Sequence, residues 1–172
     1  MALLIFPYSA IVNAAESVEM KIHVTGHIRA TGSCTFSKKG PLNIGFGTVL
    51  YSTLGGNTLK DTSPQSLTSS MSCTGDYAGQ TTMQLIPTIT GETDYQGVRL
   101  MQVMDDSKGV PSKDLGIRLL VNGAPQNVNE AFNVDMTAQP TLKVELVQIG
   151  NGDGFVNGAA FSAAATLTMA FL

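Results

Sequence analysis

The side chains of this chain best able to do chemistry include its only two histidines, His23 and His27. They belong to "SVEMKIHVTGHI", residues 17–28, in which apolar and polar residues alternate as they do in a β-strand. Both histidines fall on the polar face of that strand, where they could touch one side of a metal ion. No third ligand lies near them in the sequence. We therefore interpret them as solvated side chains rather than as a metal site.

The carboxylates give no stronger indication of a catalytic site. Asp105 and Asp106 are adjacent, so in a strand they would face opposite sides, and beside "SKG" they are typical of a turn. Three other aspartates stand singly near turns, where Asp favours local backbone hydrogen bonds: Asp114, Asp135 and Asp153.

Sequence motifs of common enzymes are missing as well. A Ser–His–acid triad would have to take its histidine from the first 27 residues. The sequence has no nucleophile elbow, no phosphate-binding loop and no calcium-loop pattern, and "GNGDG" at 150–154 indicates a glycine-rich turn rather than a calcium site. An enzymatic function has no positive support.

Two cysteines, Cys34 and Cys73, are the remaining reactive groups. An even number of cysteines in an exported chain favours a disulfide. A bridge would close a loop of about 40 residues and stabilise the fold by about 4 kcal/mol. The alternative is two buried free thiols. A zinc site is disfavoured, because the cysteines are far apart in sequence and histidines are scarce.

Export itself is indicated by the first fifteen residues, "MALLIFPYSAIVNAA", which are typical of a secretory signal peptide. The apolar stretch from Ala2 to Val12 is too short to span a bilayer, and small residues follow it, as a signal peptidase requires. No Lys or Arg precedes the apolar stretch. That leaves a true start further upstream, or a buried N-terminal strand, as alternatives. We expect cleavage near Ala14 or Ala15.

Composition narrows the class of protein further. A chain of 172 residues is long enough for one domain with a sizeable core. Only 13% of its residues are charged, the net charge is −3, and its ten Lys and Arg residues form no cluster that could neutralise phosphates, so we expect no nucleic-acid partner. A surface rich in Thr, Ser, Asn, Gln and Gly suits a secreted β protein or one buried in an assembly.

The periodicity predicts a single all-β domain. Strands are expected at residues 42–50, 66–73, 81–89, 98–104, 115–121, 141–149 and 161–172. Turn signals separate them, at "KKGP", "LGGN", "TGDYAG", "TGETD", "DDSKG", "VNGAPQN" and "GNGDG". No segment gives a helical stripe of three turns. Many short strands with Gly-rich turns favour a β-sandwich. The Asn-Gly at 122–123 could close a tight hairpin, although Pro125 makes a longer loop equally reasonable.

Taken in order, these segments resemble a known family. A leader, an alternating strand with a glycine, "GSCTF", "FGTV" and a second cysteine in "SMSC" are similar to fimbrial (pilus) subunits. So are "LGIRLLVNGAPQNV" and a chain that ends in "AATLTMAFL". The family is the chaperone–usher class of type 1-like pilins, and the resemblance covers residues 16–172. It implies a signal peptide at 1–15, an N-terminal extension at 16–30 and a pilin domain at 31–172.

The resemblance implies an immunoglobulin-like β-sandwich that lacks its last strand and is completed by donor-strand exchange. Pilin complementation is itself a standard example of strand addition, so this mechanism comes from the family. The groove-filling positions of the extension would be Met20, Ile22, Val24, Gly26 and Ile28. Family extensions commonly carry a glycine where a pocket is too shallow for a side chain, which fits a glycine within a strand at a close backbone approach. The alternative is that residues 17–28 form the first strand of their own domain.

At the other end, the resemblance implies that the last strand is the groove wall. Its alternating positions are Ala163, Ala165, Leu167, Met169 and Phe171. This strand would meet first a periplasmic chaperone and later the extension of a neighbouring pilin subunit, with an outer-membrane usher as the third partner. Family members usually have Tyr where this chain has Phe171, which keeps the ring but removes a hydroxyl. The carboxylate of Leu172 would be anchored by basic residues of the chaperone.

The resemblance therefore predicts a structural subunit of a surface fimbria, exported through the periplasm, with no enzymatic activity and no cofactor. One-domain length and a donor strand argue against a two-domain tip adhesin, and leave a rod, minor or adaptor subunit. The alternative function is a free-standing secreted carbohydrate-binding β-sandwich. It is disfavoured by the absence of Trp and by an aromatic content of 6%, because shallow sugar sites usually present aromatic platforms.

Overall fold

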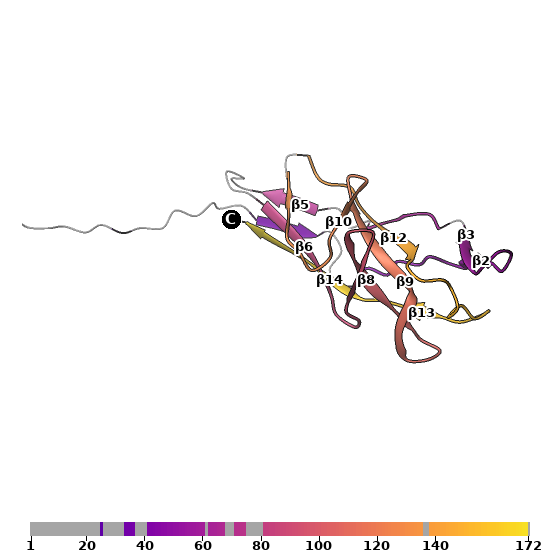
Figure 1. Ribbon diagram of the computed structural model, residues 1–172. Helices are drawn as coiled ribbons and strands as arrows, with labels where there is room; N and C mark the ends of the chain where they lie inside the picture. Colours follow the sequence, from indigo (N-terminus) through magenta and orange to yellow (C-terminus); the bar gives the residue numbers. More distant parts are fainter. Residues whose placement is uncertain are drawn as a thin grey trace, which may run out of the picture.

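The described part of the chain consists of β-strands joined by turns (Figure 1). The structure is a computed structural model that describes residues 25, 33–36, 41–60, 62–67, 71–74, 81–135 and 138–171, with the backbone alone at 71–74 and 171. In chain order the strands are β1 (Ser33–Phe36), β2 (Leu50–Ser52), β3 (Thr58–Lys60), β4 (Gln65–Ser66), β5 (Met71–Thr74), β6 (Thr81–Pro87), β7 (Glu92–Tyr95), β8 (Val98–Asp105), β9 (Val110–Val121), β10 (Ala124–Gln126), β11 (Phe132–Val134), β12 (Leu142–Gln148), β13 (Phe161–Ser162) and β14 (Ala165–Phe171). Within these residues, no helix is long and apolar enough to cross a membrane.

The larger sheet has seven strands and is built around β9. Its order is β13-β8-β9-β12-β4, with β7 paired to β8 and β10 paired to β9. β9 pairs with β12 in an unbroken antiparallel register from Leu115 to Val121. Against β8 the register shifts between Gln102 and Met104, so that residues 112–115 of β9 bulge out of the ladder. A bulge of this kind bends the strand and leaves its extra residues without partners on β8.

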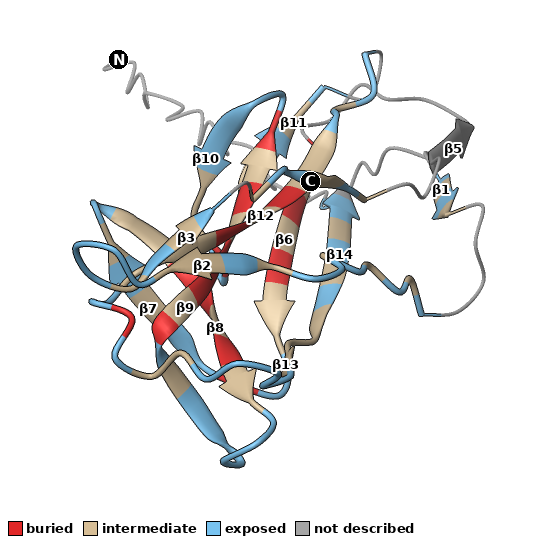
Figure 2. Ribbon diagram, turned by 90° about the vertical axis from the view of Figure 1, so that its right-hand side faces the viewer, coloured by how far each residue is buried: buried red, intermediate tan, exposed pale blue. Residues whose placement is uncertain are grey.

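The smaller sheet, in the order β11-β6-β14, packs face to face with the larger one. Residues of β6, β8, β9 and β12, together with Val128 from the loop after β10, form one cluster of buried side chains: Leu85, Met101, Val103, Ile117, Leu119, Val121, Val128, Val144 and Leu146. Figure 2 shows buried stretches on all four of these strands. Each such side chain, when fully buried, stabilises the fold by about 1.5–3 kcal/mol as an upper estimate. The two layers therefore share one core, as a β-sandwich requires.

Most of the strands expected from alternation are present. β6, β8, β9 and β12 confirm the strands predicted at 81–89, 98–104, 115–121 and 141–149. The strand predicted at 66–73 is divided between β4 and β5, and residues 68–70 lie outside the described part. The opening strand predicted at 17–28 also lies outside it, apart from Thr25, which is exposed and not in a strand.

The strand predicted at 42–50 is largely wrong. Only Leu50 belongs to a strand, β2, which pairs with β3. Residues 42–47 nevertheless alternate between half-buried and exposed, and Ile44 and Phe46 pack against the core. Alternating burial shows which way the side chains face. A strand also needs a hydrogen-bonding partner for its backbone, and residues 42–47 have no such partner strand among the described residues.

Several short strands lie where the sequence predicted turns or nothing, and β3 is one of them. β7 occupies most of "TGETD" because Gln96 and Gly97, with φ of 53° and 78°, close a two-residue hairpin to β8. β10 follows the same kind of hairpin at Asn122 and Gly123, with φ of 51° and 83°, so the tight turn rather than the longer loop is correct. Pro125 is accommodated because β10 is a short peripheral strand. β11 was not predicted.

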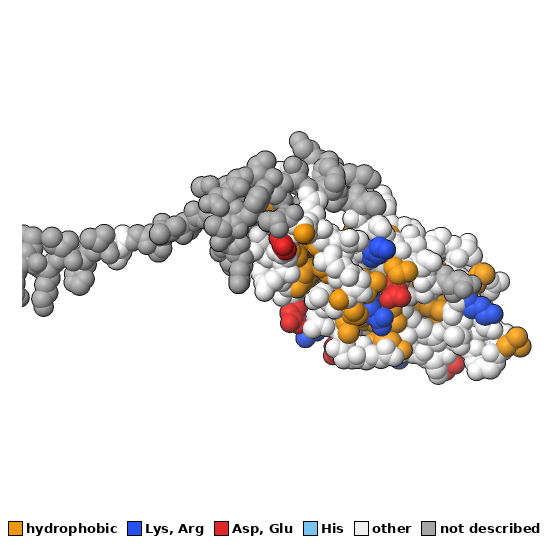
Figure 3. All heavy atoms as spheres, turned by 90° about the horizontal axis from the view of Figure 1, so that it is seen from above, with side chains coloured by type: hydrophobic (Ala, Val, Ile, Leu, Met, Phe, Trp, Pro, Cys, Tyr) orange, Lys and Arg blue, Asp and Glu red, His pale blue; other side chains and the backbone are white. Residues whose placement is uncertain are grey.

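Charged side chains are sparse on the surface and occur next to hydrophobic ones. On the face in Figure 3, basic and acidic side chains lie close together among hydrophobic patches. One such pair joins adjacent strands of the larger sheet: Arg118 Nη1 of β9 is 3.3 Å from Glu145 Oε2 of β12. Both side chains are half-buried, and the cost of removing them from water offsets much of their attraction, so the pair adds little net stability. The fold therefore depends on its shared apolar core.

Candidate functional site

Strand β14 forms one edge of the smaller sheet (Figures 1 and 2). It pairs with β6 along its whole length, from Ala165 opposite Pro87 to Phe171 opposite Thr81. On its other side, no strand within the described residues pairs with it. A free edge presents a row of unpaired backbone N–H and C=O groups, which is a template for another strand.

The core-facing side chains of β14 are less covered than their partners on β6. Leu167 and Met169 lie directly opposite Leu85 and Met83 in the ladder. The two β6 residues are 5% and 1% exposed, whereas Leu167 and Met169 are only half-buried. Between them, Thr168 faces outward and is exposed. The core side chains of β6 are thus buried, whereas those of β14 are partly exposed to solvent, so the core is incompletely covered along the β14 edge.

The predicted strand 161–172 is broken, and its break connects the two sheets. Phe161 and Ser162 form β13, which pairs with β8 in the larger sheet, and the chain resumes as β14 in the smaller one. Ala163 therefore lies in the connection and not in the last strand, although it packs against the core as expected. Two ladders in different sheets cannot be continuous, so the strand is interrupted here. Residues 161–165 are all half-buried, and burial alternates only from Ala165 onward, within β14.

Only some of the remaining residues predicted for strand exchange lie in the described part of the chain. Ala165 is half-buried against the core, as its inward position requires. Phe171 is described by its backbone alone, at the end of β14. Leu172 lies outside the described residues. So do the five positions of the extension, Met20, Ile22, Val24, Gly26 and Ile28. Their roles stay predictions.

The two cysteines meet in the small β1–β5 ladder. Cys34 and Cys73 are directly opposite in its antiparallel register. Opposed residues of such a pair have Cα atoms about 4.5–5.5 Å apart, which lies within the range that disulfides span. Cys34 is not a free cysteine. The backbone therefore favours the predicted bridge over two separate thiols, and the Cys34–Cys73 pairing itself stays a prediction.

We expect mass spectrometry of the non-reduced periplasmic protein to find Cys34 linked to Cys73. A bridge closing a loop of this length should contribute about 4 kcal/mol, so reduction should lower the midpoint of thermal unfolding. A double variant, Cys34→Ser with Cys73→Ser, provides the control and should not respond to reductant. Two thiols that alkylate in the native protein would contradict the bridge.

A buried carboxylate, Asp114, holds a distant loop. It lies in the bulge of β9 and is 6% exposed. Its Oδ1 accepts a hydrogen bond from the Gly152 amide at 2.9 Å, and its Oδ2 accepts one from the Gly154 amide at 2.8 Å. The prediction of a local hydrogen bond near a turn is thus wrong for this carboxylate. Burial without any partner would be costly, and the two amides compensate for it.

The same loop also binds the β2–β3 hairpin. Asn57 Nδ2 donates to the Gly152 carbonyl at 2.9 Å. Gln148 Nε2 donates to the Asn57 carbonyl at 2.8 Å, and Gln148 Oε1 accepts from the Leu59 amide at 2.9 Å. A side chain at Gly152 or Gly154 would collide with Asn57 or Asp114, so both positions need glycine. The sequence signal that could have revealed this contact is the alternate glycine pattern of "GNGDG".

Among the other candidate acids, Asp105 and Asp153 bond locally as turn residues do, whereas Asp106 bonds to β13. Asp105 Oδ1 accepts hydrogen bonds from the Ser107 and Lys108 amides in the β8–β9 turn. Hydrogen bonds from the Ser107 hydroxyl and from Lys108 lower the pKa of Asp105. Asp153 bonds locally, to Asn151 at 2.6 Å and 3.2 Å. Asp106 accepts from the Ser162 hydroxyl at 2.6 Å, and Asp135 is exposed.

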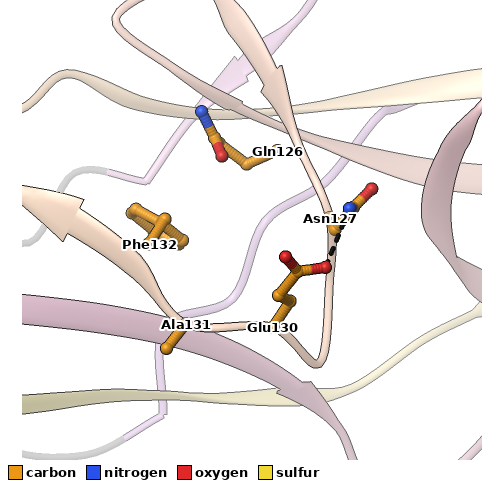
Figure 4. Close-up of a pocket in the computed structure, with 5 residues that line it drawn as sticks. All are labelled: Gln126, Asn127, Glu130, Ala131 and Phe132. Atoms are coloured by element: carbon orange, nitrogen blue, oxygen red, sulfur yellow. Dashed lines mark hydrogen bonds between the residues drawn. The ribbon is translucent and has the colours of Figure 1, made fainter.

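Neither a metal centre nor a ligand cavity emerges from these groups. Among the described residues, no three His, Cys, Asp or Glu side chains lie together as a metal site would require. A hollow beside β11 is lined by Gln126, Asn127, Glu130, Ala131 and Phe132, with Asn127 donating to Glu130 at 2.9 Å (Figure 4). Its volume of about 30 Å³ admits a water molecule and is far below that of a pocket for a small-molecule ligand. The feature best suited to bind a partner is the unpaired edge of β14, which could accept another strand.

The geometry defines a class: a two-layer β-sandwich whose smaller sheet ends in an unpaired strand beside an incompletely covered core. Comparison with protein families matches residues 22–171 to the family described as fimbrial protein. The chain belongs to the fimbrial protein family, whose fold is an immunoglobulin-like sandwich completed by donor-strand exchange. Comparison with curated proteins found no match.

Membership gives the protein a structural and non-enzymatic role in a cell-surface fimbria. The resemblance stated from sequence motifs is thereby confirmed, and so is the all-β fold class.

Proposed function

We propose that this chain is a fimbrial subunit that polymerises by donating residues 16–30 to the groove of a neighbouring pilin subunit. Its own groove lies along the free edge of β14. The observation that carries the proposal is the difference in cover across one ladder, where Leu167 and Met169 are half-buried and their β6 partners are sealed. An inserted strand would pair with the β14 backbone and cover these side chains.

The segment at residues 41–49 supplies a second wall for this groove. Ile44, Phe46 and Val49 pack against the same core as Ala165 and Leu167 do, yet their backbone has no strand partner among the described residues. The Phe46 ring lies 6.4 Å from the Phe161 ring, just before the chain crosses to β14. A donated strand between 41–49 and β14 would supply backbone partners for both segments.

The energy available to such a contact is sufficient for a fibre without covalent links. Four apolar side chains of the extension, Met20, Ile22, Val24 and Ile28, would each contribute roughly 1.5–3 kcal/mol on full burial, as an upper estimate. Each backbone hydrogen bond along the seven residues of β14 would add about 1 kcal/mol net. Gly26 would occupy the point where the groove is too shallow for a side chain.

An open core edge also explains why a periplasmic chaperone and an outer-membrane usher belong to the proposal. An unpaired apolar edge is prone to aggregate, so the subunit must be covered from export until insertion. The signal peptide at 1–15, the extension at 16–30 and the pilin domain at 31–172 are the corresponding divisions of the chain. A single sandwich with its own donor strand favours a rod, minor or adaptor subunit over a tip adhesin.

Thermal unfolding of a truncated subunit, with and without a peptide, tests the proposal. A variant that lacks residues 16–28 should be stabilised by a peptide of that sequence, because a ligand that binds only the folded state raises its stability with concentration. A peptide with the order of its residues scrambled is the matched control. Unchanged stability on adding either peptide would favour a complete, free-standing sandwich, which is the reading that also permits a secreted carbohydrate-binding protein.

A further inference from the structure

The sequence contains three Asn-Gly dipeptides, at 122–123, 151–152 and 157–158. In such a pair the amide nitrogen of the glycine can attack the asparagine side chain, because glycine places no Cβ in the way. Attack requires that this amide and the side chain be free to approach each other. The three sites have the same local sequence, so the fold decides which of them can react.

At Asn151 the nucleophile is occupied. The Gly152 amide donates to Asp114 Oδ1 at 2.9 Å, and Gly152 is buried. The Asn151 side chain is also held, since its Nδ2 donates to Asp153 Oδ2 at 2.6 Å. Asp114 protects the adjacent Asp-Gly pair in the same way, because its Oδ2 accepts from the Gly154 amide at 2.8 Å.

At Asn122 the electrophile is held. The side-chain Oδ1 of Asn122 accepts a hydrogen bond from the Thr141 backbone amide at 2.8 Å. The backbone amide of Asn122 donates to the Thr141 carbonyl at 2.8 Å. Both bonds join the β9–β10 hairpin to Thr141, the residue before β12, so the Asn122 side chain cannot turn toward Gly123 without breaking its bond to the Thr141 amide.

Asn157 has no such restraint. It lies with Gly158 in a turn closed by the Ala159 amide and the Val156 carbonyl at 3.1 Å, and both residues are exposed. Within the described residues, no hydrogen bond is recorded for the Asn157 side chain or the Gly158 amide. We propose that Asn157 is the site of spontaneous deamidation in the folded protein, and that Asp114 suppresses the same reaction at Asn151.

The reaction needs only water. The Gly158 nitrogen forms a bond to Asn157 Cγ, the Cγ–Nδ2 bond breaks, and the proton lost by the amide leaves with that nitrogen as ammonia. Water then opens the resulting succinimide at one of its two carbonyls, giving aspartate or isoaspartate. Either product adds one negative charge to a chain whose net charge is −3. In a long-lived assembly, each subunit would acquire this charge with age.

Peptide mapping with isoaspartate detection tests the proposal. The purified full chain is incubated at mildly alkaline pH, once folded and once in denaturant. In the folded protein, Asn157 should react about tenfold or more faster than Asn151, because a hydrogen bond to a charged acceptor holds the Gly152 amide. In denaturant the three sites should react at comparable rates, since each is followed by glycine.

Two variants test separately whether Asn157 is the reactive site and whether Asp114 protects Asn151 from deamidation. Asn157→Gln should remove the fast phase, and Asp114→Asn, which retains only one acceptor oxygen, should raise the folded-state rate at Asn151. Asp106→Asn, an exposed change that leaves the 150–154 loop untouched, is the matched control and should not raise it. Equal rates at Asn157 and Asn151 in the folded wild-type protein would overturn the proposal, as would a fast phase that survives in Asn157→Gln.

Discussion

Replacing Leu167 with glutamate should abolish recovery of the subunit with its periplasmic chaperone, whereas the same replacement at Thr168 should leave recovery nearly unchanged. The two positions are neighbours on β14, and they differ in the face they present. Leu167 packs against the core opposite Leu85, and Thr168 is exposed. Burying an unpaired carboxylate costs on the order of several kcal/mol, which is a large part of the stability of a small domain.

The measurement is co-purification from periplasmic extract with a tagged chaperone, quantified against total exported subunit. Thr168→Glu loses one hydrogen bond, from its hydroxyl to the Gln84 carbonyl at 3.3 Å, and should keep most of the complex. Leu167→Met, which conserves volume and polarity, should also be tolerated. Normal recovery of Leu167→Glu would show that the chaperone binds another edge. Equal loss with Thr168→Glu would show that the outer face of β14 is the contact.

Replacing Gly26 with leucine should reduce polymerisation by about fivefold or more, and Thr25→Leu should reduce it far less. Forcing a side chain into a pocket with no room for it costs about 1–3 kcal/mol, which corresponds to roughly five- to 150-fold in affinity. Thr25 alternates to the opposite face of the extension, so a larger side chain there would face away from the groove. It is exposed in the isolated subunit.

Polymerisation is measured by adding each variant, in its chaperone complex, to subunits that lack residues 16–28 and following the appearance of dimers that resist dissociation. Gly26→Ala should give an intermediate rate, because a methyl group intrudes less. Chaperone binding should be equal for all three variants, which separates a defect in donation from a defect in folding. Equal polymerisation of Gly26→Leu and Thr25→Leu would contradict the assignment of Gly26 to the groove.

The sequence predicts the central strands well, since alternation and burial coincide in β6, β8, β9 and β12. The sequence-based prediction fails where side chains alternate between two faces but the backbone has no paired strand, or where a strand forms without such alternation. Residues 42–47 alternate correctly but have no ladder, because their backbone partner is not supplied by the described part of this chain. In β7 the hairpin of Gln96 and Gly97 creates a strand from residues whose composition is typical of a turn.

The free edge was predictable only through the family resemblance. Alternation in 161–172 gives the inward residues, but it cannot say that β14 pairs on one side alone or that the chain changes sheets at Ala163. The role of Asp114 was missed for a related reason. Its partners, Gly152 and Gly154, are far away in sequence. The residues around a single carboxylate form no pattern that predicts a hydrogen bond to such distant amides.

The change of sheet between β13 and β14 would decide how the subunit distributes a pulling force applied along a fimbria. If a neighbour's strand lies along β14, a pull on the fibre loads that ladder lengthwise, so its hydrogen bonds share the force instead of opening one after another. The force then divides. Part passes sideways to β6, and part passes through Ala163 and Ala164 into β13 and β8 of the other layer. On that arrangement both sheets would resist extension together, so within the described residues no single ladder would carry the whole load.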